Sequence, residues 1–282
     1  MTVTMNIAGA LKQAENVLAA VSDSARRDAQ VLLCHVLSES LSYLRTWPER
    51  EVPTEKQQTF DGLVRQRQLG EPVAYLTGER EFWSLPFLVT SDTLIPRPET
   101  ELLVEQTLKH LATDRPQTVL DLGTGSGVIA LALAKERPHW HLTATDASLA
   151  ALRIAEKNAR RLKLANVQFD YGSWYAPLAA RRFHAIVSNP PYVADRDPHL
   201  ALGDVRFEPS SALVSGHDGL DDIRHIVAGA PDHLETGGWL LLEHGYDQGE
   251  AVVTLLRQRG FVAVTTLSDL AKQPRVTIGQ WQ

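Results

Sequence analysis

The chain has 282 residues, of which 44% are hydrophobic and 22% are charged, which is ordinary for a globular protein and excludes disordered, collagen-like and coiled-coil chains. Its 28 basic and 34 acidic residues leave a formal net charge of −6, without the cationic excess that tight binding to a long phosphate backbone requires. We therefore expect no stable nucleic-acid partner, and the length is sufficient for a core domain with an accessory one.

Targeting signals and metal-binding patterns are absent from the sequence. Residues 1–20 lack a positive start followed by an uninterrupted apolar stretch, and no window of eighteen apolar residues occurs elsewhere. Cys34 is the only cysteine, which excludes an internal disulfide, and the ten histidines lack the spacing of metal ligands. We expect a cytoplasmic monomer with no membrane contact and no metal site.

The first part of the chain predicts short amphipathic helices. From Ile7 to about Gly70 the apolar residues recur at intervals of three and four, and a more polar helix is expected around residues 55–68. Residues 81–95 then alternate as strands do, and Pro86 among them suggests a hairpin or an extended connector. We therefore place a domain boundary near residue 81.

The rest of the chain alternates between apolar strands and amphipathic helices. Ile95 to Glu101 should open a helix, because Pro98 suits a first turn and acidic residues favour a helix N-terminus. The expected strands are 118–122, 142–145, 167–169, 185–188, 239–243, 261–265 and 275–278, and the expected helices are 126–136, 149–162, 221–234 and 249–259. This alternation predicts an α/β fold with a parallel sheet and helices on both of its faces.

A glycine-rich loop joins the first of these strands to the next helix. Asp121–Gly127 reads DLGTGSG, in which the glycines let the backbone turn sharply and approach a ligand, while the helix N-terminus supplies free N–H groups. The loop therefore predicts a ligand site. A triphosphate is disfavoured because Ser126-Gly127-Val128 lacks the lysine of a phosphate-binding P-loop.

Two ligands compete for this loop, a dinucleotide and S-adenosylmethionine. Asp146, at the end of the next strand, could hold a ribose hydroxyl of either one. Asp121, directly before the loop, would repel a pyrophosphate but can attract the ammonium group of a methionine moiety, directly or through water. The acidic residue favours S-adenosylmethionine.

Asn189-Pro190-Pro191-Tyr192 follows the apolar run 183–187, where a strand should end. The side-chain oxygen of Asn189 and the carbonyl of Pro190 can each accept one proton of a planar NH2 group, while Tyr192 stacks on its π face. A turn that merely ends a strand is the alternative. Residues 193–217, the one long irregular stretch, are expected to form a functional or mobile loop beside the substrate.

These motifs resemble a known group of enzymes. Asp121–Gly127, Asp146 and Asn189–Tyr192 resemble the class I S-adenosylmethionine-dependent methyltransferases that modify planar nitrogens. The resemblance narrows to the bacterial peptide chain release factor glutamine N5-methyltransferases through three further blocks, Ile95–Glu101 (IPRPETE), Phe207–Leu220 (FEPSSALVSGHDGL) and Glu243–Gly245 (EHG). Because DNA adenine methyltransferases share the Asn-Pro-Pro-Tyr motif, the narrower resemblance depends on these blocks.

The resemblance implies a Rossmann-like methyltransferase domain with a seven-stranded mixed sheet, preceded by a small helical bundle. The implied parts are a substrate-binding helical domain at 1–80, a hairpin linker at 81–97 and the methyltransferase domain at 98–282. The implied substrate is the glutamine of the Gly-Gly-Gln loop in peptide chain release factors. The residues implied to bind the cofactor are Asp121, Gly123, Thr124, Gly125, Ser126, Gly127, Asp146, Trp174 and Asn189.

The expected chemistry is methyl transfer to a carboxamide nitrogen, whose lone pair is delocalised into the carbonyl. Asn189 and the Pro190 carbonyl would hold the two protons so that the lone pair faces the methyl donor, and Tyr192 would restrain the amide plane, with Pro191 completing the substrate site. A methylated amide loses its proton readily, so we name no catalytic His or Glu and expect no essential group to titrate near neutrality. The roles of Arg97, Glu99 and Glu101 stay open; Arg97 could pair with either glutamate or with the substrate.

Three other functions fit parts of the pattern. An adenine-N6 methyltransferase acting on DNA or RNA could use the same amide cage, but it must unstack a base and grip phosphates, which the acidic charge balance disfavours. A non-enzymatic S-adenosylmethionine-binding module would leave the intact Asn189 and Tyr192 without a purpose. A nicotinamide oxidoreductase would leave the whole Asn-Pro-Pro-Tyr motif unexplained.

Overall fold

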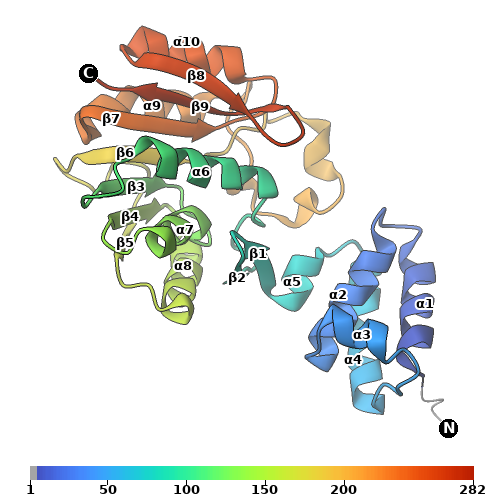
Figure 1. The fold of residues 1–282 in the computed structure, drawn as a ribbon. Coiled ribbons are helices and arrows are strands. Elements are labelled where there is room, and N and C mark those ends of the chain that lie inside the picture. The colour runs from blue at the N-terminus through green and yellow to red at the C-terminus, as the bar shows by residue number, and fades with distance from the viewer. Residues whose placement is uncertain (1–4) are drawn as a thin grey trace. The chain divides into compact units, whose positions relative to one another are not determined.

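The computed structural model describes residues 5–282, which form two compact units (Figure 1). One unit contains the chain up to Glu79 together with Ala201–Phe207, and the other contains Arg80–Leu200 and Glu208–Gln282. The sequence predicts three consecutive parts, whereas in the structure the hairpin segment belongs to the second unit and a short internal segment joins the first. In the part of the chain that the structure describes, no helix is both long and apolar enough to cross a membrane.

The first unit is helical, as the apolar periodicity predicts. Its helices are α1 (Ile7–Leu18), α2 (Ala25–Leu37), α3 (Leu41–Thr46), α4 (Thr54–Gln68) and α5 (Val73–Thr77). Their apolar faces share one core in which Leu18, Leu32 and Phe60 are almost fully buried. The first helix begins where Asn6 Oδ1 accepts the N–H of Gly9 at 2.8 Å, which satisfies one of the free donors of the helix end.

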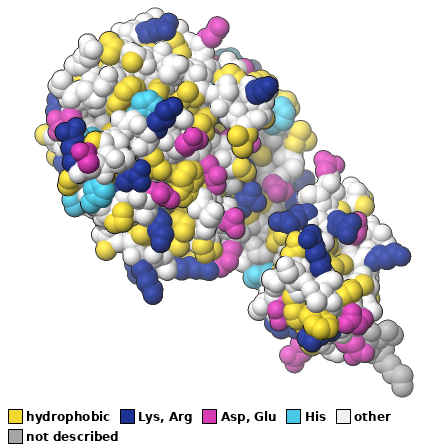
Figure 2. All heavy atoms as spheres, viewed as in Figure 1, with side chains coloured by type: hydrophobic (Ala, Val, Ile, Leu, Met, Phe, Trp, Pro, Cys, Tyr) yellow, Lys and Arg dark blue, Asp and Glu magenta, His cyan; other side chains and the backbone are white. Residues whose placement is uncertain are grey.

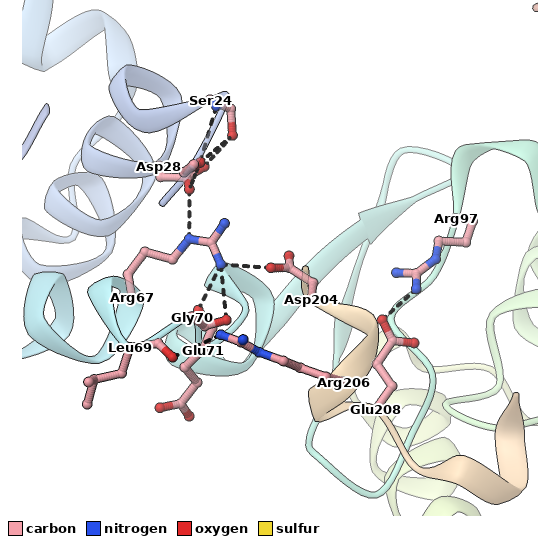
Figure 3. A network of polar contacts seen from close by, with 11 residues as sticks. Ser24, Asp28, Arg67, Leu69, Gly70, Glu71, Arg97, Asp204, Arg206 and Glu208 are labelled. Atoms are coloured by element: carbon pink, nitrogen blue, oxygen red, sulfur yellow. Dashed lines mark hydrogen bonds and ion pairs between the residues drawn. The ribbon is translucent and has the colours of Figure 1, made fainter. Parts of the chain in front are cut away.

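A partly buried network of polar contacts attaches residues 201–207 to these helices (Figure 3). Arg67 of α4 donates from Nε to Asp28 Oδ2 at 2.8 Å and from Nη1 to Asp204 Oδ1 at 2.7 Å. Arg206 donates to the carbonyl of Leu69 at 3.1 Å. The expected long loop is therefore divided, because its middle part makes contacts of its own with the helical unit.

The irregular stretch also contains more regular structure than expected. It holds three short 3-10 helices, η2 (Pro198–Ala201), η3 (Val205–Phe207) and η4 (Ser210–Ala212). The 3-10 turns provide local hydrogen-bond partners for some of the backbone N–H and C=O groups. Val193 also donates its N–H to the carbonyl of Leu213 at 2.8 Å. The two ends of the stretch are thus joined by a backbone contact within the second unit.

The second unit is built on a seven-stranded sheet in the order β5-β4-β3-β6-β7-β9-β8. Its strands are β3 (Thr118–Leu122), β4 (His141–Asp146), β5 (Val167–Tyr171), β6 (Phe183–Ser188), β7 (Leu234–Glu243), β8 (Val262–Ser268) and β9 (Pro274–Gln280). The first five pair in parallel, whereas β9 is antiparallel to both β7 and β8. The mixed sheet confirms the predicted fold class. It corrects the all-parallel reading of the alternation, because residues 269–273 are too few to form a crossover helix.

Helices cover both faces of this sheet (Figure 1). They are α6 (Glu101–His110), α7 (Val128–Glu136), α8 (Leu149–Leu162), α9 (Asp221–His233) and α10 (Gly249–Arg259). Successive strand residues face opposite sides, so Val119 packs in the cluster that includes α6, α7 and α8, while Leu120 packs in the cluster with α9 and α10. Because both faces of β3 and β6 are buried, the sequences of these strands are mostly apolar and do not alternate with polar residues.

The predicted hairpin is present as the two-stranded sheet of β1 (Glu79–Phe82) and β2 (Leu85–Leu88). Its turn places Trp83 at φ 52° and Ser84 at φ 56°, a left-handed conformation that side chains other than glycine adopt at a cost. Glu101 Oε1 accepts the N–H of Trp83 at 2.7 Å, and Glu136 Oε1 accepts the indole N–H at 2.8 Å. These hydrogen bonds from α6 and α7 hold the turn.

Asn158 of α8 connects the hairpin to the glycine loop, and its removal tests this connection. Its side chain accepts the N–H of Leu88 at 2.7 Å and donates to the carbonyls of Leu88 and Ser126 at 3.0 and 2.9 Å. Asn158→Ala strands these buried groups, so we expect a loss of about 2–4 kcal/mol in unfolding free energy, measured by urea denaturation. The exposed neighbour Lys157→Ala is the control, and equal effects of the two variants would contradict the assignment.

Candidate active site

The parallel register gathers the predicted site residues along one edge of the sheet. Leu122 at the end of β3 pairs with Ser188 at the end of β6, and β4 and β7 continue the same alignment on either side. The residues that end or directly follow these strands are Gly123, Asp146, Asn189 and Glu243. Because β3 lies between β4 and β6, this edge holds the crevice in which doubly wound sheets bind ligands.

The glycine loop has the backbone shape that its sequence predicts. Gly123 and Gly127 adopt φ of +71° and +88°, in the region that favours glycine. A Cβ on Gly127 would lie 3.1 Å from the Cβ of Ala155, so this glycine allows the start of α7 to pack against α8. The N–H of Gly125 donates to Asp146 Oδ2 at 2.8 Å, which links the loop to the end of β4.

A cavity of about 380 Å³ opens beside this loop, within the size range of small-molecule sites. Of the predicted residues it is lined by Gly123, Thr124, Gly125, Ser126, Asp146, Trp174, Asn189 and Pro191. It also contacts Pro96, Arg97 and Thr100 of the IPRPETE block and Pro209, Ser211 and Ala212 of the FEPSSALV block. Segments far apart in the sequence therefore meet around one hollow, as the resemblance implies.

Four predicted residues, Asp121, Gly127, Pro190 and Tyr192, do not line the cavity. Asp121 has no exposed surface; its Oδ2 accepts the hydroxyl of Thr124 at 2.6 Å and the N–H of Ala130 at 3.2 Å. This carboxylate faces the start of α7 and holds the loop, and its expected attraction of an ammonium group, directly or through water, stays a prediction. Its Oδ1 has no hydrogen-bond partner among residues 5–282.

The two acidic residues of the site differ in environment. Burial raises the pKa of Asp121 to about 7, the nearby charge of Asp146 adds to the rise, and the hydrogen bonds from Thr124 and Ala130 oppose it. Burial also raises the pKa of Asp146, opposed by the N–H groups of Ser148 and Gly125. A carboxylate has about four acceptor positions, so Asp146 keeps capacity for further donors facing the cavity.

Trp174 lines the cavity, and its expected contact with an adenine stays a prediction. A Cβ on Gly123 would lie 3.4 Å from Cζ3 of this indole, so the ring packs beside the glycine loop at the cavity wall. Its backbone adopts φ 49°, and its carbonyl accepts the hydroxyl of Thr145 at 3.2 Å. The strained backbone is held by a neighbour at the end of β4, which is compatible with a functional position.

The side-chain amide of Asn189 is held on one side only. Its Nδ2 donates to Thr100 Oγ1 at 3.1 Å. Within the described residues no hydrogen bond reaches Asn189 Oδ1. This oxygen is therefore available to accept a proton from a group that enters the cavity.

Tyr192 is more deeply buried than a ring that is free to stack on a substrate. Its ring packs against the core cluster beneath α9 and α10, and burial, together with the charge of Glu243, raises the pKa of its hydroxyl. Gln248 Nε2 donates to its backbone carbonyl at 3.0 Å. The cavity wall at this point is formed by Pro191, so the stacking role of Tyr192 stays a prediction.

The structure shows hydrogen-bond partners for Arg97 and Glu101 of the IPRPETE block, whose roles the sequence left open. Arg97 Nη2 donates to the buried Glu208 Oε1 at 2.5 Å, which joins the block to the FEPSSALV segment (Figure 3). Glu101 accepts the N–H of Trp83 and so supports the hairpin. The sequence left the partner of Arg97 open between Glu99, Glu101 and the substrate, and the structure pairs it with Glu208 instead of either nearby glutamate.

Thr100 and Glu243 were missed as site residues in the sequence, although both lie in blocks that carry the resemblance. Thr100 is 2% exposed and accepts a hydrogen bond from Asn189 Nδ2, and Glu243 is 1% exposed at the end of β7. A hydroxyl between two glutamates of a helix start reads as a helix-capping pattern. No spacing rule connects residues 100, 189 and 243, so only the sheet register brings them together.

The raised pKa of Asp121 predicts a pH-dependent stability. Its folded pKa of about 7 lies above the ordinary value of 3.8, so the folded state retains a proton that the unfolded state has lost. The free energy of unfolding should therefore fall as the pH rises from about 4 to about 7 and change no further above that range. Asp121→Asn keeps an acceptor but cannot ionise, so the stability of this variant relative to the wild type should increase across the window.

The slope of that difference should be at most about 1.4 kcal/mol per pH unit. Urea unfolding at a series of fixed pH values, followed by tryptophan fluorescence, measures it. A difference that stays constant between about pH 4.5 and about pH 7.5 would show that Asp121 is not the titrating group.

Comparisons with known proteins agree with this geometry. Family models match at residues 9–78, the PrmC N-terminal domain, and at residues 98–216, the methyltransferase small domain. The release factor glutamine methyltransferase of Pseudomonas aeruginosa is 58% identical, over 92% of this chain and 94% of its own length. That of Vibrio cholerae is 52% identical, over 99% of this chain and 98% of its own length.

A solved methyltransferase structure from Pyrococcus furiosus matches with a TM-score of 0.55 at 18% identity, covering 77% of this chain and 97% of that chain. This likeness bears on the fold alone and agrees with the mixed seven-stranded sheet. The identity and coverage of the bacterial relatives establish the family, and they confirm the resemblance seen in the sequence. The chain belongs to the release factor glutamine methyltransferases.

Proposed function

We propose that this protein transfers a methyl group from S-adenosylmethionine to the side-chain amide nitrogen of the glutamine in the Gly-Gly-Gln loop of peptide chain release factors. The observation that carries the proposal is the hold on Asn189, whose Nδ2 is bound to Thr100 while its Oδ1 stays available at the cavity. A free acceptor oxygen at the cavity suits a primary amide, because the N–H protons of that amide can donate a hydrogen bond to it. The family relationship supports the choice of a release factor glutamine.

The cavity suits the proposed donor. The positive φ at positions 123 and 125 favours glycine, which leaves these two positions of the loop without side chains. Asp146 retains acceptor capacity for ribose hydroxyls, and Trp174 supplies an aromatic wall for adenine. When bound, S-adenosylmethionine supplies an electrophilic methyl group on a sulfonium centre. The residues of the chain then have to hold the cofactor against the sheet edge and keep water from the reacting nitrogen.

The contribution of Asn189 and Pro190 is orientation. Acceptance of one amide proton by Asn189 Oδ1 and of the other by the Pro190 carbonyl holds the NH2 group so that the nitrogen lone pair faces the methyl donor. The carbonyl of Tyr192 is fixed by Gln248, so the backbone of the motif is held at its far end as well. No side chain is required to remove a proton before transfer.

The helical unit is assigned to recognition of the protein substrate. A three-residue target offers too little surface to distinguish one protein from another, so a second contact adds selectivity. The unit includes residues 201–207, whose flanking residues lead directly to the FEPSSALV block of the site. The enzyme is proposed to act as a cytoplasmic monomer. It is proposed to bind neither nucleic acid nor membrane, in agreement with the mixture of positive and negative side chains on the face drawn in Figure 2.

Asn189→Ala removes the acceptor that orients the substrate amide. We expect the methylation rate constant to fall at least about a hundredfold, because a preorganised polar group at the transition state is lost. Affinity for S-adenosylmethionine, measured by calorimetry, should stay nearly unchanged. Mass spectrometry of a purified release factor gives the rate, and equal losses in rate and cofactor affinity would refute the separate role of this residue.

Asp146→Ala should show the reverse pattern. Loss of the carboxylate removes the expected ribose contact and frees the N–H of Gly125, so cofactor affinity should weaken about tenfold or more. Calorimetric titration with S-adenosylhomocysteine measures this without turnover. Asp232→Ala, at an exposed position of α9, is the matched control, and an unchanged affinity of Asp146→Ala would count against the assignment.

A further inference from the structure

The side chain of Gln248 joins three backbone segments beyond the ends of β6 and β7. Its Oε1 accepts the N–H of Gly245, two residues after β7, at 2.8 Å. Its Nε2 donates to the carbonyl of Tyr192, the last residue of the Asn-Pro-Pro-Tyr motif, at 3.0 Å and to the carbonyl of Asp218 at 3.3 Å. Gln248 directly precedes α10, yet its side chain does not cap that helix. The side chain therefore connects the motif to the turn after β7.

The polarity of the three partners fixes which end of the Gln248 amide faces each of them. A backbone N–H only donates, so Gly245 requires the amide oxygen. A carbonyl only accepts, so Tyr192 and Asp218 require the NH2 group, whose two protons match the two carbonyls. Both ends of this amide are thus assigned by backbone groups whose polarity cannot reverse. An ionised glutamate at this position would keep the acceptor but lose both donors.

Gly219 allows the Tyr192 carbonyl to lie close to Gln248. This glycine adopts φ +75°, in the region that favours glycine. A Cβ at this position would lie 2.3 Å from the carbonyl oxygen of Tyr192 and 2.7 Å from Gln248 Nε2. Both distances are far below van der Waals contact, so a larger residue would displace the carbonyl or the amide. The glycine near the end of the FEPSSALVSGHDGL block thus lies directly against the motif.

The chain that leaves the motif is also paired. Val193 donates its N–H to the carbonyl of Leu213 at 2.8 Å, and its carbonyl accepts the N–H of Ser215 at 2.9 Å. This ladder begins directly after Tyr192, whose own carbonyl is held by Gln248. The backbone is therefore held without a break from the last residue of the motif into the chain that follows.

The first residue of the motif has an anchor of its own, because Asn189 Nδ2 donates to Thr100 Oγ1 at 3.1 Å. Between the two anchored ends lie Pro190 and Pro191, whose rings restrict φ of both residues. With both ends held and φ restricted between them, the Pro190 carbonyl has little freedom to turn. Loss of the hydrogen bond from Gln248 would release one of the two ends.

We propose that Gln248 and Gly219 are positioning residues for methyl transfer. They fix the carbonyl of Tyr192, and through it the Pro190 carbonyl that accepts one proton of the substrate amide. This inference rests on the proposed function of the motif. Neither Gln248 nor Gly219 lines the cavity, so both act through the motif and not on the substrate. The acceptor has to be held within about 0.5 Å of its productive position, which a backbone free at one end does not provide.

Two substitutions of Gln248 separate positioning from a role in closing the turn before α10. Gln248→Glu keeps the acceptor for the N–H of Gly245 but places a carboxylate against two carbonyls, whereas Gln248→Met removes all three hydrogen bonds. We expect kcat to fall about 10-fold in both variants, with calorimetric affinity for S-adenosylhomocysteine retained. Glu250→Ala, at an exposed position of the same turn, is the control and should keep the wild-type kcat. Wild-type kcat in Gln248→Glu would leave only the turn-closing role and overturn the proposal.

Gly219→Ala tests the close approach to the motif. The added Cβ should displace the Tyr192 carbonyl, so kcat should fall at least about 10-fold. Gly237→Ala is the matched control, because Gly237 has φ +84° and the nearest atom to a Cβ there would be 4.0 Å away. Both variants place alanine at positive φ and should lose similar stability in urea denaturation, but only Gly219→Ala should lose kcat. Equal kcat values of the two variants would refute the role of Gly219.

A readout without turnover keeps this inference separate from the proposed function. Tyr192-Val193 is the only Tyr-Val pair in the sequence, so ¹³C-carbonyl labelling of tyrosine with ¹⁵N labelling of valine gives one signal, from the peptide between them. We expect the carbonyl shift to change in Gln248→Met and Gly219→Ala but not in Gly237→Ala. An unchanged shift in Gln248→Met refutes the contact. A changed shift, in a protein whose wild type fails to methylate release factors, refutes the proposed function and leaves the contact established.

Discussion

The parallel register of β4, β3, β6 and β7 is the constraint on which the site depends. The strands themselves supply few reactive side chains, because Val119, Leu120 and their neighbours pack in the two core clusters. What matters is that the strands end at the same level, so a glycine loop, a carboxylate, an amide and a second carboxylate emerge along one edge. A shift of register would bury these groups or separate them.

Three acidic residues lie at this edge, and they differ in burial and in their hydrogen-bond partners. Asp121 is enclosed entirely and holds Thr124 and the start of α7, whereas Asp146 lies at the cavity with two backbone donors and spare capacity. Glu243 is enclosed at the end of β7. Burial raises the pKa of all three carboxyl groups, and the charge of Asp146 adds to the rise at Asp121.

Residues 201–207 belong to the helical unit, although the chain before and after them belongs to the methyltransferase unit. Within the helical unit, Asp204 pairs with Arg67. Within the methyltransferase unit, Glu208 pairs with Arg97, which lines the cavity. The stretch that follows Asn-Pro-Pro-Tyr therefore makes charged contacts on both sides of Phe207.

The sequence by itself determined the helical start, the hairpin, nearly all strand positions and the family, because hydrophobic periodicity and short motifs are local properties. It also identified the glycine loop, Asp146 and Asn189, whose neighbours in the chain signal their role. Only the tertiary structure decided that Asp121 faces inward, that Arg97 pairs with Glu208, and that Thr100 contacts Asn189. These contacts join residues separated by long stretches of chain, and their partners are chosen by strand register and burial, which no local pattern records.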